Sequence, residues 1–171
     1  VVDRAFNEEL FKVKDTMRSP YYNGLHLINR KVLIEYLRQL LHGDQRIAPF
    51  DILALEDAVY TQIAFETADN NVRKIRIGGI IDRLDRVTDP HTGMSTIRVV
   101  DYKTGVQATR KIKEIEEIFS DANISQKHSD YYLQALLYSL IVDNSTKYNI
   151  QKGCVSPALL FIKQASKEDY N

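Results

Sequence analysis

Two aspartates and a lysine, each placed at the end of an apolar run, are the residues of this chain best suited to chemistry. Asp82 follows the apolar residues of segment 75–81, Asp101 follows segment 97–100, and Lys103 lies two residues further on. Carboxylates bind hard divalent cations such as Mg²⁺ together with water, and an ammonium group beside such an ion suits a phosphate ester. The three side chains therefore predict metal-assisted chemistry on a phosphate, provided that the fold brings them together.

The two apolar runs predict a β-hairpin. Both are rich in β-branched residues, and segment 88–95 between them has the Pro, Gly, Asp and Ser content of a loop. If the loop closes a symmetric antiparallel pair, Asp82 lies opposite Asp101, and Lys103 shares their face because residues two apart in a strand point the same way. Two neighbouring carboxylates repel each other, which makes sense if they share a cation. A one-residue bulge would break this register.

This arrangement resembles the PD-(D/E)xK nuclease superfamily, specifically its RecB-like branch. The resemblance rests on Asp82, the hairpin that follows it, and the run Asp-Tyr-Lys-Thr-Gly at residues 101–105. Further along the chain, Gln134 and Tyr138 match the Gln-x-x-x-Tyr helix of that branch. The resemblance covers roughly residues 56–138, and it is specific because three motifs occur in the family's order.

The resemblance implies a DNA nuclease that hydrolyses phosphodiester bonds with Mg²⁺ or Mn²⁺. The ion would polarise the phosphoryl oxygen and lower the pKa of a bound water. Lys103 would orient that water or stabilise charge developing on the phosphate, and Gln134 and Tyr138 would position Lys103 and the DNA strand. The expected catalytic residues are Asp82, Asp101, Lys103, Gln134 and Tyr138, and the expected metal ligands are Asp82, Asp101, the main-chain carbonyl of Tyr102, and Glu56.

The resemblance also implies partners. RecB-like domains often sit in helicase–nuclease proteins of DNA repair or recombination and act on DNA ends or single strands. DNA and a helicase domain in the same protein or complex are therefore the expected partners, and no membrane partner is expected.

The segments before the hairpin predict elements that support it. The spacing of apolar residues predicts amphipathic helices over residues 3–17 and 22–41, and the Gly43-Asp44 pair is expected to stop the second. Residues 52–65 predict a long strand that turns at residues 69–71 into the first strand of the hairpin. These elements would place a third strand beside the two that carry the aspartates.

The register of this third strand decides where Glu56 lies. Folding about Asn70 would place Ala58 opposite Asp82, with Glu56 one diagonal step away on the same face. By the resemblance, Glu56 matches an acidic position of RecB-like nucleases, where it would be a second ligand or a polarising residue. An acid at the end of a strand also occurs as ordinary surface charge, and that alternative stays open.

The segments after the hairpin complete an α/β fold. Helices are expected over about 110–119 and 129–142, with Ser129 or Asp130 as the cap of the second, and residues 158–162 predict a buried strand. We therefore expect a central mixed sheet, with an antiparallel three-stranded part, flanked by helices like a restriction-endonuclease core.

Length and composition suit one globular domain. We expect residues 1–171 to form a single RecB-like nuclease domain, with a helical N-terminal part over 1–48 and a nuclease core over 50–165. Because the chain starts on a valine in what reads as the middle of a helix, we expect it to be a piece of a longer protein. With 23 basic and 23 acidic residues the net charge is zero, so partner domains would supply positive surface for nucleic acid.

A lone cysteine limits the cofactors and the compartment. Cys154 is the single cysteine, so the four-thiolate iron–sulfur cluster of some RecB-like nucleases cannot form, and a reducing cytoplasm is the expected setting. No apolar run reaches the length of a membrane span.

Several interpretations stay open. The domain could be a catalytically degenerate DNA-binding or scaffolding module, or an unrelated protein–protein interaction domain in which the hairpin is structural. RecB-like nucleases commonly have a histidine upstream of the first strand, but neither His26 nor His42 has a matching context. The Gly78-Gly79 pair would admit either a DNA strand or a close helix–sheet contact. Candidate phosphate contacts are Arg110, Lys111 and Lys113.

Overall fold

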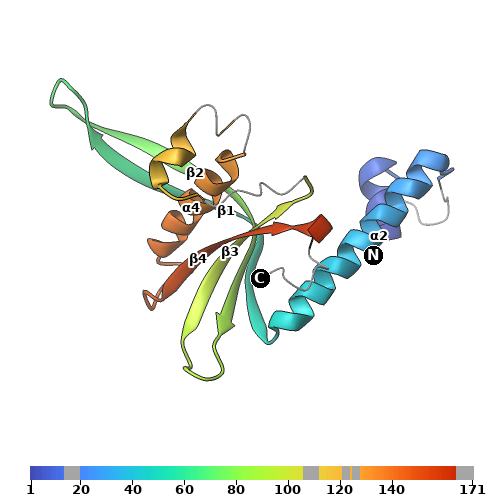
Figure 1. Cartoon of the computed structure of the whole chain (residues 1–171). Coiled ribbons are helices and arrows are strands. Elements are labelled where there is room, and N and C mark those ends of the chain that lie inside the picture. Colours follow the sequence, from blue (N-terminus) through green and yellow to red (C-terminus); the bar gives the residue numbers. More distant parts are fainter. Residues whose placement is uncertain (14–19, 106–111, 121–123, 125–127, 165–171) are drawn as a thin grey trace. The chain divides into compact units, whose positions relative to one another are not determined.

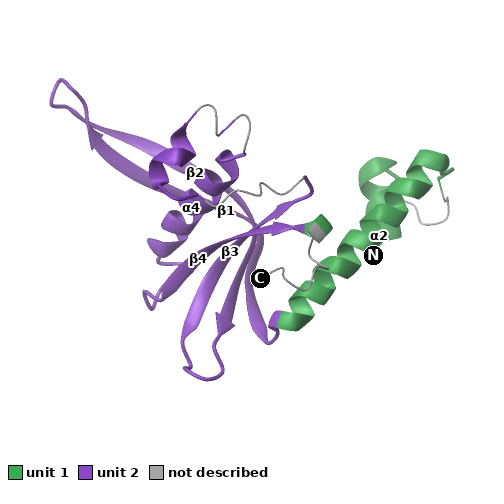
Figure 2. Cartoon of the chain, viewed as in Figure 1, with its two compact units in different colours: residues 1–46, 162–171 green, residues 47–161 purple. Residues whose placement is uncertain are grey.

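The structure is a computed structural model of the chain, and it describes residues 1–13, 20–105, 112–120, 124 and 128–164. The chain divides into two compact units, which are described separately (Figure 2). The first unit comprises residues 1–46 and 162–171, and the second comprises residues 47–161. All of the predicted site residues belong to the second unit.

The first unit is built on one long helix. The short helix α1 (Val2–Ala5) continues into the π-helical turn η1 (Phe6–Leu10), and α2 spans Gly24–Ile47. The prediction that Gly43-Asp44 stops α2 is wrong. A glycine in a helix interior costs only about 1 kcal/mol, which this helix tolerates, and α2 ends instead before Pro49, whose preceding residue disfavours helical backbone.

Helix formation near the N-terminus is shorter than the predicted span 3–17. It ends at Leu10, and residues 14–19 lie outside the described residues. The buried ring of Phe6 contacts the rings of Phe11, Tyr22 and His26 in edge-to-face geometry. This aromatic cluster gives the short helical segment its apolar contacts.

The second unit contains a four-stranded mixed sheet in the order β1-β2-β3-β4 (Figure 1). β1 (Phe50–Glu66), β2 (Val72–Thr88) and β3 (Ser95–Lys103) are antiparallel, and β4 (Cys154–Phe161) pairs with β3 in parallel. Helix α4 (Asp130–Asp143) lies between β3 and β4 in sequence and packs on the sheet. The predicted fold class, a mixed α/β sheet with an antiparallel three-stranded part, is confirmed.

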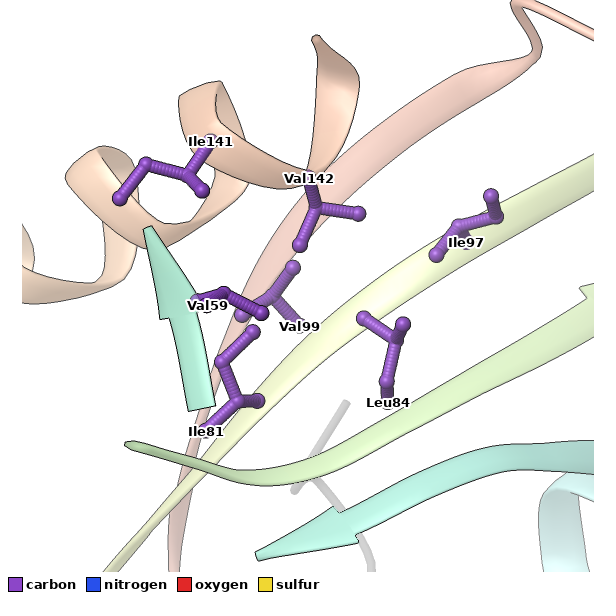
Figure 3. Packing of buried hydrophobic residues seen from close by; sticks show 7 residues of the cluster. All are labelled: Val59, Ile81, Leu84, Ile97, Val99, Ile141 and Val142. Carbon is purple, nitrogen blue, oxygen red and sulfur yellow. The ribbon is translucent and has the colours of Figure 1, made fainter. Parts of the chain in front are cut away.

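Helix α4 and the sheet enclose the hydrophobic core (Figure 3). The cluster contains Val59 from β1, Ile81 and Leu84 from β2, Ile97 and Val99 from β3, and Ile141 and Val142 from α4. Each fully buried aliphatic side chain contributes about 1.5–3 kcal/mol relative to exposure to water. This packing fixes α4 over the strands that carry the site residues.

The predicted register of the β2–β3 hairpin is confirmed. The ladder pairs Arg83 with Val100 and continues in equal steps to Thr88 and Ser95. The loop is closed by hydrogen bonds from Asp89 N to Met94 O and from Gly93 N to Asp89 O, both 2.9 Å. Continued one step beyond Arg83 and Val100, the same count places Asp82 opposite Asp101.

The predicted register of β1 against β2 is wrong by two residues, because Ala58 pairs with Ile80 and not with Asp82. The reason lies in the turn, which is centred on Asp69 and not on Asn70. Thr67 N and Thr67 Oγ1 both bond to Asn71 O, at 2.9 and 2.8 Å. Moving the turn centre by one residue shifts every pair from Glu66–Val72 to Ala54–Leu84 by two, and an irregularity between Ile52 and Ala54 shifts the remaining pairs by one more.

Two further elements differ from expectation. The segment predicted to be a helix over 110–119 forms only the 3₁₀ turn η2 (Ile115–Phe119), and residues 106–111 lie outside the described residues. Ser129 stands at the N-cap of α4, but its hydroxyl donates to Ile118 O at 3.0 Å and not to the helix. The short 3₁₀ turn η3 (Ile162–Gln164) follows β4 and belongs to the first unit.

Candidate active site

Asp82 lies in the interior of β2 and connects this strand to the C-terminal end of β3. Its Oδ2 atom accepts a hydrogen bond from the main-chain N of Tyr102 at 2.7 Å. This bond fixes the carboxylate beside the peptide that links Asp101 and Lys103. The residues that the sequence placed at two strand ends are therefore adjacent in the folded chain.

Lys103 occupies the centre of a group of polar contacts between β3 and α4. Its Nζ lies 2.7 Å from Asp101 Oδ2 and 3.1 Å from Gln134 Oε1, to which it donates a hydrogen bond. The same ammonium lies 4.4 Å from the centre of the Tyr131 ring, within the range of a cation–π contact. Asp101, Lys103, Gln134 and Tyr131 thus form one connected group.

Asp101 is a buried carboxyl group, and its surroundings act on its pKa in opposite directions. Its residue is 6% exposed, and this burial raises its pKa above the ordinary value of 3.8, with a further raising effect from the charge of Asp82. The hydrogen bond and the charge of Lys103 act in the other direction. Burial therefore raises the pKa of Asp101 more than Lys103 lowers it, which disfavours the charged carboxylate. A cation bound beside it would stabilise the charged form.

Tyr138 packs directly on β2. A Cβ atom built on Gly79 would lie 2.2 Å from the Tyr138 hydroxyl and 3.1 Å from its Cζ. Glycine at this position is thus what allows α4 to approach the strand. Of the two interpretations of Gly78-Gly79, the structure supports the close helix–sheet contact.

Glu56 lies on β1 at the position between the pairs Leu55–Arg83 and Asp57–Ile81, which places it opposite Asp82 along the ladder. It has a left-handed backbone conformation with a φ of 48°, and its side chain is exposed. Within the described residues, no three His, Cys, Asp or Glu side chains are grouped closely enough to hold one ion. The structure therefore brings Asp82 and Asp101 together without a third carboxylate.

The donor set at Asp82 and Asp101 fits a hard divalent cation. Among the described residues, the hydrogen bond to Asp82 and the ion pair to Asp101 each use Oδ2, so an ion could bind Oδ1 of each carboxylate together with water. Mg²⁺ is commonly bound by one or two carboxylates and several waters. Such a site can bind a phosphate next to the ammonium of Lys103.

Sequence reasoning did not assign a role to a second charged cluster formed by Arg83, Asp85 and Arg98. Asp85 is fully buried and receives two 2.7 Å bonds from Arg98 and a 2.9 Å ion pair from Arg83. The guanidinium of Arg83 lies 5.4 Å from the Phe50 ring centre and 5.6 Å from that of Tyr102. The hairpin count that pairs Asp82 with Asp101 also pairs Asp85 with Arg98, so the sequence contained a signal for it.

Other candidate residues lie apart or outside the described chain. Arg110 and Lys111 lie outside the described residues, and Lys113 is exposed. His26 belongs to the first unit, where its Nδ1 accepts a hydrogen bond from Asn23 N at 3.3 Å. His42 is exposed on α2.

Comparison with known protein families identifies the superfamily of this chain. The family model of the PD-(D/E)XK nuclease superfamily matches residues 1–170. No curated protein matches the chain. Among the described residues, no helix has the length and apolar character needed to cross a membrane.

Proposed function

Because the chain belongs to the PD-(D/E)XK nuclease superfamily, we propose that it is a metal-dependent deoxyribonuclease acting at Asp82, Asp101 and Lys103. The observation that carries the proposal is the connected group in which Lys103 Nζ contacts both Asp101 and Gln134, at 2.7 and 3.1 Å. A lysine held beside two carboxylates on adjacent strands suits the binding of a metal ion and a phosphodiester together.

The carboxylates of Asp82 and Asp101 and the carbonyl of Tyr102 would hold Mg²⁺ or Mn²⁺, with Glu56 as a further ligand, directly or through water. When bound, the ion supplies Lewis acidity and lowers the pKa of a coordinated water. In hydrolysis the water oxygen forms a bond to phosphorus, one P–O ester bond breaks, and the water proton passes to the leaving oxygen. Lys103 would donate to the phosphoryl oxygen on which negative charge develops.

Gln134 and Tyr138 act as positioning residues in this proposal. Gln134 accepts from Lys103 and so fixes the direction of the ammonium. Tyr138 holds α4 at contact distance from Gly79, which keeps Gln134 within reach of Lys103. Both residues would lie beside the DNA strand as it passes the site.

The finer assignment follows from the sequence resemblance. We assign the domain to the RecB-like branch and propose that it works on DNA ends or single strands in repair or recombination, together with a helicase domain. The lone Cys154 is consistent with a cytoplasmic setting.

The test is cleavage of labelled single- and double-stranded DNA in Mg²⁺, Mn²⁺ or EDTA. Asp101→Ala and Lys103→Ala should each lower the rate at least about 100-fold, and EDTA should abolish cleavage. Asp51→Ala and Lys152→Ala change exposed residues of the same types and should leave the rate unchanged. Metal-dependent cleavage that survives Asp101→Ala would show that the reaction occurs elsewhere.

A catalytically degenerate DNA-binding module of the same fold is the second candidate. The observation that favours it is the absence, among the described residues, of a three-ligand group that could hold a metal ion. It predicts DNA binding without cleavage and no heat of Mg²⁺ or Mn²⁺ binding in calorimetry. Detectable metal binding that Asp82→Asn removes would exclude it.

A further inference from the structure

The hairpin of β1 and β2 continues beyond the rest of the sheet as a two-stranded ribbon (Figure 1). β3 pairs with β2 only over residues 83–88, whereas β1 pairs with β2 out to Glu66 and Val72. We refer to residues 60–66 and 72–78 as the ribbon. Its strands are direct continuations of those that carry Glu56 and Asp82.

The central part of the ribbon is positively charged. Residues 60–65 and 73–78 include Arg73, Lys74 and Arg76 but no aspartate or glutamate. All three cations are exposed, and in the described part of the chain none forms an ion pair with a carboxylate. Because the whole chain has zero net charge, the ribbon is a local concentration of positive charge on an otherwise balanced protein.

Two acidic residues, Glu66 and Asp69, lie at the tip of the ribbon. Glu66 closes the last pair of the ladder, and Asp69 lies in the turn. The Asp69 carboxylate accepts a 2.7 Å hydrogen bond from Asn71 Nδ2 and a further one from Thr67 Oγ1. These bonds tie the Asp69 carboxylate to its neighbours within the turn.

One of the cations is already oriented by an aromatic ring. The guanidinium carbon of Arg76 lies 3.9 Å from the centre of the Tyr60 ring, and Tyr60 is 50% exposed. Gly78 makes room for that ring, since a Cβ atom there would lie 2.6 Å from Tyr60 Cδ1. A guanidinium stacked in this way keeps its in-plane N–H donors free for a phosphate and loses less side-chain entropy on binding.

We propose that the ribbon binds the sugar–phosphate backbone of duplex DNA beside the cleavage site. The proposal rests on the proposed function and assigns the surface that holds the substrate away from the scissile phosphate. A two-stranded β-ribbon fits the major groove of B-DNA, which is about 12 Å wide. Arg76 lies six positions before Asp82 along β2. At about 3.3 Å per residue and about 3.4 Å per base pair, the ribbon reaches phosphates about six base pairs from the bond cleaved.

The experiment measures duplex binding in EDTA, where the proposed hydrolysis cannot run. Fluorescence anisotropy with a labelled duplex gives affinity at several salt concentrations for wild type and for Lys74→Glu/Arg76→Glu. The double variant should lose about 10- to 100-fold in affinity at low salt, and the slope of log affinity against log salt should fall by about two. Tyr60→Ala should lose part of the same affinity, and Tyr60→Phe should retain it.

A matched control separates a local effect from a change in overall charge. Lys31→Glu/Lys152→Glu makes the same change in net charge at two exposed positions outside the ribbon. Its salt slope should equal that of wild type. An equal loss in the control and in the ribbon variant would overturn the proposal, as would a ribbon variant that binds duplex like wild type while losing contact with a partner protein.

The outcomes also distinguish the ribbon from the catalytic site. Wild-type cleavage that depends on Asp101 but not on Lys74 and Arg76, in rate or in KM, would overturn the ribbon proposal and leave the nuclease intact. Salt-dependent duplex binding through the ribbon without cleavage would support the ribbon and reject the nuclease. If the double variant does not fold, Arg76→Gln carries the test, with an expected fall in slope of about one.

Discussion

Replacing Gly79 by alanine should displace Tyr138 and so disturb the contact that holds α4 on the sheet. The added Cβ would lie 2.2 Å from the Tyr138 hydroxyl oxygen, whereas ordinary van der Waals contact begins near 3.4 Å. The oxygen must therefore move by about 1.2 Å. Because Tyr138 packs against the core cluster, its ring cannot swing away without losing contacts.

We expect Gly79→Ala to lower the free energy of unfolding by about 1–3 kcal/mol, the usual cost of inserting a methyl group into packed structure. It should also slow cleavage, because Tyr138 is proposed to keep α4, and with it Gln134, beside Lys103. The size of the loss depends on how far α4 retreats from β2.

A double-mutant cycle in urea denaturation tests this reasoning. Tyr138→Phe removes the oxygen and leaves ring carbons at 3.1 and 3.2 Å, so Gly79→Ala should cost about 1 kcal/mol less in that background. Gly43→Ala is the matched control, since nothing lies within 4 Å of its added Cβ, and in the interior of α2 it should stabilise by about 0.5–1 kcal/mol. An equal cost of Gly79→Ala with and without the tyrosine hydroxyl would refute the reasoning.

Three other predictions follow from the charged groups. Burial raises the pKa of Asp101 above 3.8. The protonated side chain therefore contributes favourably to the free energy of unfolding below pH 3.8, and this contribution is lost as the pH rises through the raised pKa. Urea titrations of wild type and Asp101→Asn should therefore diverge across that window. Asp85→Asn removes the buried carboxylate that pairs with Arg83 and Arg98 and should cost about 3–5 kcal/mol in urea denaturation. Asp57→Asn breaks an exposed pair with Lys147 and should cost much less; similar costs for the two variants would contradict this. Mg²⁺ at about 100 times its dissociation constant should stabilise wild type by about 2.7 kcal/mol, and a thermal shift that persists in Asp101→Asn would contradict binding at this site.

The central hairpin could be predicted from the sequence because its loop and its strand ends are defined by residue type. Segment 88–95 has the residue types of a turn, and the apolar runs 75–81 and 97–100 directly precede Asp82 and Asp101. Once the loop is placed, counting residues in equal steps along the two strands gives a single register, and the observed pairs from Thr88–Ser95 to Arg83–Val100 confirm it. The Lys103–Gln134 contact followed from the resemblance and not from the hairpin, since α4 lies about thirty residues further along the chain.

The β1–β2 register could not be predicted in the same way. Thr67, Asp69, Asn70 and Asn71 are all suited to a turn, so residue type does not identify the centre. The choice is made by side-chain hydrogen bonds that Thr67 forms with the turn. This difference in register affects the candidate site, because it moves Glu56 from a position diagonal to Asp82 to the position opposite it.

The run Asp82-Arg83-Leu84-Asp85 explains why hydrophobic periodicity could not assign the two faces of β2. Such a strand normally presents apolar residues to one side and polar residues to the other, but here charges lie on both. Asp82 binds the main chain of Tyr102 beside Lys103, which contacts α4, whereas Arg83 lies near the Tyr102 ring and pairs with Asp85.

The cluster of Arg83, Asp85 and Arg98 carries one more positive than negative charge. Arg83 and Asp85 are buried, and the Arg98 side chain is 22% exposed. Its field acts through the low-dielectric interior, where Coulomb interactions are stronger than in water. A net positive charge repels a divalent cation, so the charge of this cluster should influence how tightly the two carboxylates hold Mg²⁺. Asp85→Asn makes the cluster more positive and Arg98→Met makes it less positive, so the two variants should shift Mg²⁺ affinity in opposite directions in calorimetry. Affinities that move together would show that the cluster acts only through stability.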